Sequence, residues 1–165
     1  MKIIKAKLPL GKTINTVEPI SFPEEIYTDN HIRHIEDTEI NLSSTMYESF
    51  VRAVVDFKVK VIVACAYTLE DVPLDLHIHD ELIFTEDEND EEDYYEPGPT
   101  IVLDDYILGL ILARVPIKVV KKGAKLPEGG DSYRVIDEDS LNEERMNRKD
   151  ERWNVLDQIE FDEDK

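Results

Sequence analysis

The sequence predicts an α+β fold: an antiparallel β-sheet arranged as a meander, with one core helix and two short C-terminal helices. Apolar and polar residues alternate from residue 53 to 63 and again from 72 to 84, which is the pattern of half-buried strands. The link between the two stretches, residues 64 to 71, is too short for a parallel crossover, so they predict an antiparallel hairpin. Residues 103 to 115 are apolar around most of a helix, which predicts a core helix packed on that sheet.

The N-terminal third predicts further, shorter strands. Residues 1 to 8 indicate a strand that ends at a Pro and Gly turn, and residues 12 to 30 indicate strands interrupted by loops. Ile35, Ile40 and Leu42 are assigned to a strand that precedes the hairpin in the same sheet. This pattern predicts about five strands in the sheet. The pattern leaves open whether the sheet closes into a barrel.

The ends of the core helix are expected to follow from three residues. Asp104 is expected to cap the free N–H groups of the first turn, while Leu103 packs back on the helix as a hydrophobic staple. Pro116 is expected to end the helix, because the residue before a proline avoids the helical conformation.

The chain length of 165 residues favours one domain, which we expect to span residues 1–160. Like charge in the acidic run predicts a disordered loop at about residues 86–98. Towards the C-terminus, Ser140 has the form of a capping box and Asp150 is expected to cap a second short helix. Residues 161–165 are expected to fray.

Charge is distributed unevenly along the chain. The net charge is −19, which disfavours general binding to nucleic-acid phosphates. Residues 86–96 hold eight acids and no base, whereas residues 107–127 hold five bases and no acid. The five basic residues are candidate contacts to a partner or to RNA: Arg114, Lys118, Lys121, Lys122 and Lys125. The alternative is that they pair with acids of the same chain.

The sequence contains none of the common catalytic motifs: no P-loop, no G-x-G-x-x-G, no G-x-S-x-G and no H-E-x-x-H. His77 and His79 form an H-x-H pair near Cys65, but no third metal ligand is evident. We therefore expect a protein that is not an enzyme and has no metal, no cofactor and no small-molecule substrate.

Three features predict a cytoplasmic location. No stretch approaches the roughly 20 apolar residues that cross a bilayer, the first residues lack a signal-peptide core, and the single cysteine suits a reducing compartment. We expect no membrane association. The sequence does not indicate an oligomeric state.

From residue 61, the segment VIVACAYTLEDVPLDL resembles the YceD family, a bacterial and plastid family linked to accumulation of large-subunit ribosomal RNA. The family places C-x-x-C and then Leu between two strands. Cys65 and Leu69 match this pattern, whereas Thr68 replaces the second cysteine. An acidic loop and an apolar helix that ends at Pro116, YILGLILARVP, follow in the family's order.

The C-terminal part is similar to the low-GC Gram-positive branch of that family, which lacks a cysteine-rich tail. A Gly-Asp turn at Gly130 and Asp131 lies at the start of the segment GGDSYRVIDEDSLNEER, and a D-x-R-x-x-x-L signature is met by Asp150, Arg152 and Leu156. The resemblance spans roughly residues 40–160. Because one thiolate cannot hold a tetrahedral ion, a structural zinc is not expected.

The resemblance implies a non-enzymatic ribosome biogenesis factor. Its expected partners are a basic ribosomal protein, precursor ribosomal RNA of the large subunit, or both. The negative charge favours the protein partner. An acidic interaction or regulatory module unrelated to ribosomes is the alternative.

Overall fold

The computed structural model describes residues 1–24, 27, 31–88 and 93–147. The chain divides into two compact units, Met1–Gly123 and Ala124–Lys165. The second unit contains helix α2 (Glu138–Asn147), which has no buried residue.

The first unit is built on a six-stranded sheet. Its strand order is β2-β4-β5-β6-β7, and β3 pairs with β5 alongside β4. The strands are β2 (Thr13–Ile20), β3 (Ile32–Ile35), β4 (Thr38–Met46), β5 (Phe50–Ala64), β6 (Asp71–Thr85) and β7 (Tyr94–Tyr95). Within the described part of the chain, β2 and β7 stand at the two ends of this order and do not pair. The sheet is therefore open and not a barrel.

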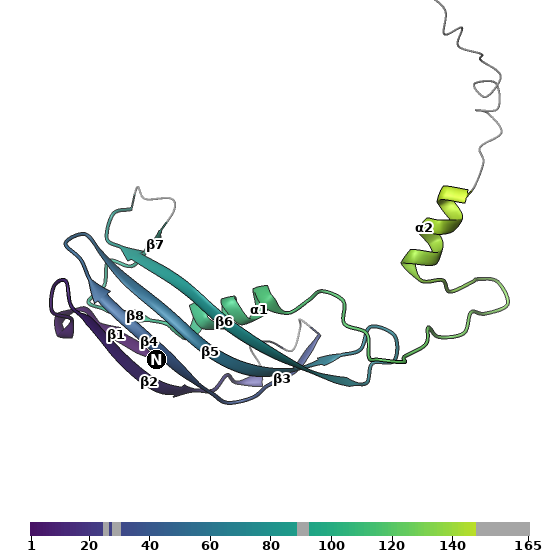
Figure 1. Cartoon of the computed structure of the whole chain (residues 1–165), viewed down its shortest axis with the longest axis horizontal. Coiled ribbons are helices and arrows are strands. Elements are labelled where there is room, and N and C mark those ends of the chain that lie inside the picture. The colour runs from purple at the N-terminus through teal and green to yellow at the C-terminus, as the bar shows by residue number, and fades with distance from the viewer. Residues whose placement is uncertain (25–26, 28–30, 89–92, 148–165) are drawn as a thin grey trace, which may run out of the picture. The chain divides into compact units, whose positions relative to one another are not determined.

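The predicted hairpin is confirmed. β5 and β6 each span 15 residues, and their antiparallel register runs from Phe50 opposite Thr85 to Ala64 opposite Asp71. The odd-numbered residues of β5 from 51 to 63 are all buried, as the alternation predicts. Figure 1 shows the two long strands lying side by side.

Two short strands form a second, separate sheet. β1 (Lys2–Ile4) pairs antiparallel with β8 (Thr100–Val102), and a 3₁₀ turn over Lys5–Lys7 follows β1. The strand expected over residues 1–8 is thus shorter than predicted. Among the described residues the large sheet holds six strands, where about five were expected, and the second sheet adds β1 and β8, because strands of two or three residues are too short to show alternation.

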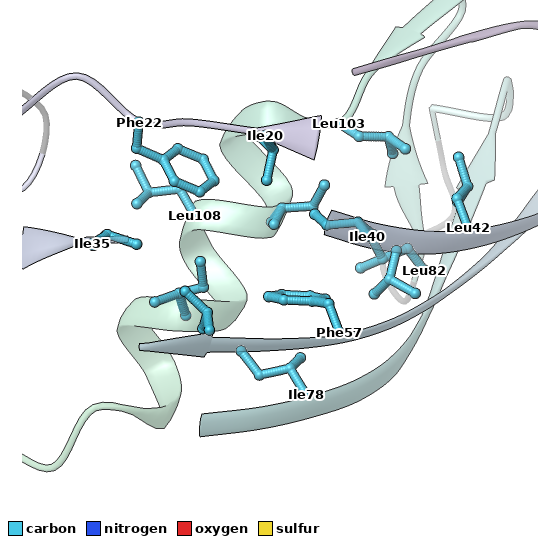
Figure 2. Close-up of a cluster of buried hydrophobic side chains, with 14 of the residues drawn as sticks. Ile20, Phe22, Ile35, Ile40, Leu42, Phe57, Ile78, Leu82, Leu103 and Leu108 are labelled. Carbon is cyan, nitrogen blue, oxygen red and sulfur yellow. The ribbon is translucent and has the colours of Figure 1, made fainter. Parts of the chain in front are cut away.

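Helix α1 (Asp104–Arg114) packs on the core face of the large sheet, as predicted. Ile107, Leu108 and Ile111 are its buried residues, and they belong to one hydrophobic cluster with the sheet. Figure 2 shows Leu108 of this helix gathered with Phe22, which follows β2, and with sheet residues such as Phe57. Within Met1–Gly123, α1 is the one α-helix among the described residues, so this unit leaves the opposite face of the sheet without a helix of its own, which is common for antiparallel sheets.

The start of α1 differs from the prediction. Leu103 occupies the N-cap position with helical backbone angles, and no side chain caps the helix. Asp104 instead lies in the first turn, where its carboxylate binds the N-terminal amine of Met1. At the other end Val115 is extended, as required before Pro116.

The start of α2 also differs. Asp137 caps this helix instead of Ser140: its two carboxylate oxygens accept hydrogen bonds from the Ser140 backbone N–H and hydroxyl, both at 2.8 Å. The helix expected from Asp150 and the tail at 161–165 lie outside the described residues.

Part of the loop expected to be disordered at residues 86–98 carries regular structure. Tyr94–Tyr95 form β7, which pairs in parallel with Phe84 and Thr85 at the end of β6. Residues 89–92 lie outside the described residues. Among the described residues, no helix is long and apolar enough to cross a membrane.

Candidate functional site

The hairpin tip, residues 65–70, joins β5 to β6 and carries the cysteine and leucine of the predicted motif. The Cys65 N–H donates to the Glu70 carbonyl at 2.8 Å, and the Leu69 N–H donates to the Cys65 carbonyl at 2.9 Å. This turn places Leu69 at a φ of 59°, a left-handed conformation that costs a non-glycine residue about 1–2 kcal/mol. The Leu69 side chain is nevertheless 69% exposed, so burial of its side chain does not offset this strain.

The segment that follows α1 packs against the hairpin tip. The Ala66 N–H donates to the Val119 carbonyl at 2.8 Å. On the other side, the Ala64 N–H donates to the His31 carbonyl at 3.0 Å, and the His31 ring lies 3.3 Å from the Pro116 carbonyl. The structure therefore joins the residues on either side of Cys65 to the segment that begins at Pro116, a relation that the sequence indicated only through the family resemblance.

Backbone strain is concentrated around this tip. In the part of the chain that the structure describes, His31 and Leu69 are the non-glycine residues with positive φ. Leu69 bonds to Cys65 within the tip, and His31 bonds to Ala64, which precedes it. Strained backbone of this kind persists where the surrounding structure holds it firmly, and it is common at functional sites.

Cys65 is fully buried and not in a disulfide. Its Sγ accepts a hydrogen bond from the Lys121 backbone N–H at 3.4 Å. This bond, helped by the Thr68 hydroxyl, lowers the pKa of the Cys65 thiol to about 7 against the opposing effect of burial. Hydrogen bonds to a thiolate favour the charged form in this way.

The candidate basic residues do not form one free patch. Arg114 pairs with Asp80 of β6 at 3.1 Å, and Lys121 pairs with Glu70 of the tip at 3.1 Å. Lys118 lies over the Tyr67 ring, 5.3 Å from its centre.

The other two candidate cations lie apart from these pairs. Lys122 is exposed in the first unit, whereas Lys125 belongs to the second unit. The alternative of pairing with the chain's own acids is therefore correct for Arg114 and Lys121.

The acidic run is held at both ends. Lys5 donates to Glu86 at 2.7 Å, and the Glu96 N–H donates to the Thr85 carbonyl at 2.8 Å. The Tyr106 hydroxyl donates to a Glu96 carboxylate oxygen at 2.7 Å. Burial, followed by this carboxylate, raises the pKa of Tyr106 to about 12.

Three aromatic rings pack beneath the second end of the acidic run. The Tyr106 ring lies 4.8 Å from the Tyr94 ring and 5.1 Å from the Phe84 ring, both edge-on. Sequence reasoning missed this cluster. The signal that was available is that aromatic residues flank the acidic run on both sides.

His77 and His79 both face Asp56 on the sheet surface opposite α1. Their ring nitrogens lie 3.4 and 3.0 Å from the same carboxylate oxygen. The hydrogen bond from His79 is the main cause of a lowered pKa of Asp56. Among the described residues no group of three or more His, Cys, Asp or Glu is suited to hold a metal ion, and Cys65 does not join the two histidines.

Strand β6 carries four acids, Asp71, Asp75, Asp80 and Glu81, and no Lys or Arg. The last two are paired: Asp80 with Arg114, and Glu81 with Arg52 at the opposite position of β5. Asp71 and Asp75 have no ion pair among the described residues. Asp75 lies opposite Lys60 of β5, but Lys60 pairs with Glu36 at 3.7 Å, so Asp71 and Asp75 add net negative charge next to the hairpin tip.

The remaining motif positions lie towards the C-terminus. Gly130 forms an isolated bridge with Tyr133 in the second unit, so the predicted turn, which also contains Asp131, is present. Asp150, Arg152 and Leu156 lie outside the described residues.

Comparison of the chain with protein-family models, with curated proteins and with solved structures finds no match.

Proposed function

We propose that this protein is a non-enzymatic, cytoplasmic ribosome biogenesis factor that promotes accumulation of large-subunit ribosomal RNA. In this proposal it acts by binding a basic ribosomal protein through its acidic surface. The observation that carries the choice of partner is the ion pairing of Arg114 and Lys121 with Asp80 and Glu70. Cations that are already paired are poorly available to RNA phosphates.

The charge balance supports the same partner. Asp71 and Asp75 have no ion pair in the described part of the chain, and the whole chain carries 38 acids against 19 bases. A surface of this sign attracts a basic protein over long range and accelerates its association at low salt. The resemblance in sequence supplies the link to ribosomes.

Depletion of the protein from cells tests the proposed function most directly. We expect mature large-subunit RNA to fall relative to small-subunit RNA, measured by quantitative hybridisation, and we expect re-expression of the wild-type chain to restore it. Unchanged amounts of both RNAs after depletion would remove the proposal.

Co-purification at low and high salt tests the partner. We expect a basic ribosomal protein to be retained at low salt and lost at high salt, because the attraction is screened. Recovery of only proteins unrelated to ribosomes would favour the alternative of an acidic regulatory module.

Direct binding to precursor RNA is the second candidate mode, because Lys118 and Lys122 are exposed and carry no ion pair among the described residues. With Lys125 they give at most three contacts, so the affinity for duplex RNA would fall with a log–log salt slope of about −3, on the rule derived for duplex DNA. A slope near −5 would show that Arg114 and Lys121 leave their acidic partners to bind phosphate.

A further inference from the structure

The outer edge of β6 is largely without a neighbouring strand. β5 pairs with all 15 residues of β6 on one side, whereas β7 pairs with only Phe84 and Thr85 on the other. In the described part of the chain no strand lies beside residues 71–83 on that side. A free edge of this kind presents unpaired N–H and C=O groups to which another chain can add a strand.

The contact with β7 shows which residues of β6 direct their backbone groups outward. The Glu96 N–H donates to the carbonyl of Thr85, so residue 85 faces the outer edge. Because backbone groups alternate between the two sides of a strand, the odd-numbered residues of β6 face outward. β7 also demonstrates that this edge accepts an added strand.

Two outward-facing positions are closed. Pro73 has no N–H to donate, and the N–H of Glu81 already donates to the Asp80 side chain at 3.0 Å. Asp75, His77 and His79 lie between them, and no described residue outside β5 bonds to their backbone. The open part of the edge is therefore a window of three outward-facing residues.

Side chains around this window indicate what kind of strand it fits. Leu74 and Leu76 are only partly buried at the margin of the hydrophobic core. On the other face, Asp75 has no ion pair among the described residues, and His77 and His79 follow it along the strand. Opposite them on β5 lie Asp56, Lys58 and Lys60, the last of which pairs with Glu36. An added strand that alternates apolar and basic residues would cover the two leucines with one face and meet Asp75 with the other.

We propose that the window of β6 between Pro73 and Glu81 binds an extended basic segment of a protein partner as an added β-strand. This binding mode is one of the recurrent ways in which proteins recognise peptides. The identity of the partner rests on the proposed function, since basic ribosomal proteins supply such segments. The geometry of the edge does not depend on it.

The test uses a synthetic seven-residue peptide that alternates Lys and Val, titrated into the full chain by calorimetry at low salt. His77→Pro removes the outward N–H at the centre of the window, and the matched control His77→Ala removes the imidazole but keeps the N–H. We expect His77→Ala to bind as the wild type does and His77→Pro to bind about five- to tenfold more weakly, the size expected for one net hydrogen bond plus a displaced neighbour.

A second measurement covers the outcome in which His77→Pro does not fold. Hydrogen exchange of the wild-type amides is followed with and without the peptide, and we expect slower exchange at Asp75, His77 and His79 but not at Leu76. A peptide of the same charge with prolines in place of valines should give no protection. Equal binding of the two peptides, or no protection at the three amides, would overturn the proposal.

Retention of the ribosomal partner by His77→Pro separates the two proposals. Loss of capture by His77→Pro, with capture retained by His77→Ala, supports the edge as the docking surface. Undiminished capture by a folded His77→Pro protein overturns the edge and leaves the proposed function intact. If the wild-type protein binds the peptide but captures no ribosomal component, the edge stands as a binding site and the proposed function is overturned.

Discussion

At the scale of single residues, the strained Leu69 leads to a direct prediction of stability. A φ of 59° costs the folded state about 1–2 kcal/mol with leucine but not with glycine. Glycine offsets part of this gain, because it raises the entropy of the unfolded chain. We therefore expect Leu69→Gly to raise the free energy of unfolding by about 0.5 kcal/mol, measured by urea denaturation. Thr68→Gly, in the same turn but without a positive φ, should lower it.

A gain in Leu69→Gly accompanied by loss of partner capture would indicate that the exposed leucine is retained for binding. A loss of stability in Leu69→Gly would contradict the argument from strain.

The Cys65 thiol gives a second prediction at this scale. The chain has one cysteine, so the ultraviolet absorbance of thiolate reports that residue alone once a Cys65→Ser baseline is subtracted. We expect a midpoint near pH 7, because the Lys121 N–H stabilises the charged form. A midpoint at or above the ordinary value of 9.0 would contradict it.

The same pKa shift has a definite sign for stability. A folded-state pKa below the unfolded value stabilises the fold above the unfolded pKa, and this stabilisation is lost as the pH falls through about 7. The free energy of unfolding should therefore rise between pH 7 and pH 9 more steeply in the wild type than in Cys65→Ser. Equal slopes would exclude a role for the thiolate.

At the scale of elements, helix α1 is held by its buried face. Ile111 is fully buried against the sheet, whereas Ile117, three residues beyond the helix, is 96% exposed. We expect Ile111→Ala to cost about 3 kcal/mol, the range for removing a buried aliphatic side chain, and Ile117→Ala to cost almost nothing, both measured by chemical denaturation. Similar losses in the two variants would show that α1 does not pack as described.

Elements with a long local pattern were predictable from the sequence. The alternation of β5 and β6 and the apolar surface of α1 each extend over more than ten residues, so burial on one face leaves a clear period. The short strands β1, β7 and β8 carry no such period. Their pairing depends on residues far along the chain, such as Lys2 opposite Val102.

The same limit applied to the candidate site. The sequence identified the cations between residues 107 and 127, but not that Arg114 and Lys121 pair with acids 34 and 51 residues away. It predicted caps at Asp104 and Ser140 from local form alone. In the structure Asp104 instead binds the N-terminal amine of Met1, and Asp137 caps α2 in place of Ser140.

At the scale of the whole molecule, the net charge of −19 governs stability as well as binding. Self-repulsion weakens a compact state, and salt screens it as the Debye length falls from about 30 Å at about 10 mM to about 8 Å at about 150 mM. We expect the melting temperature to rise over this range of sodium chloride, measured by circular dichroism. Sucrose of equal osmolarity is the control for effects unrelated to charge.

A fall of the melting temperature with salt would show that the surface ion pairs, such as Arg52 with Glu81, contribute more than the net repulsion costs. It would also weaken the proposal that the acidic surface binds a basic protein.

The pairing of β1 with β8 has a consequence for the order of folding during synthesis. Lys2, Ile3 and Ile4 pair as a strand with residues 100–102, so β1 leaves the ribosome about a hundred residues before its partner strand exists. The β5–β6 hairpin is complete earlier and pairs locally, so it can form before the partner of β1 has been synthesised. Closure of the core thus follows the emergence of residues 100–115, when the last strand and α1 arrive together.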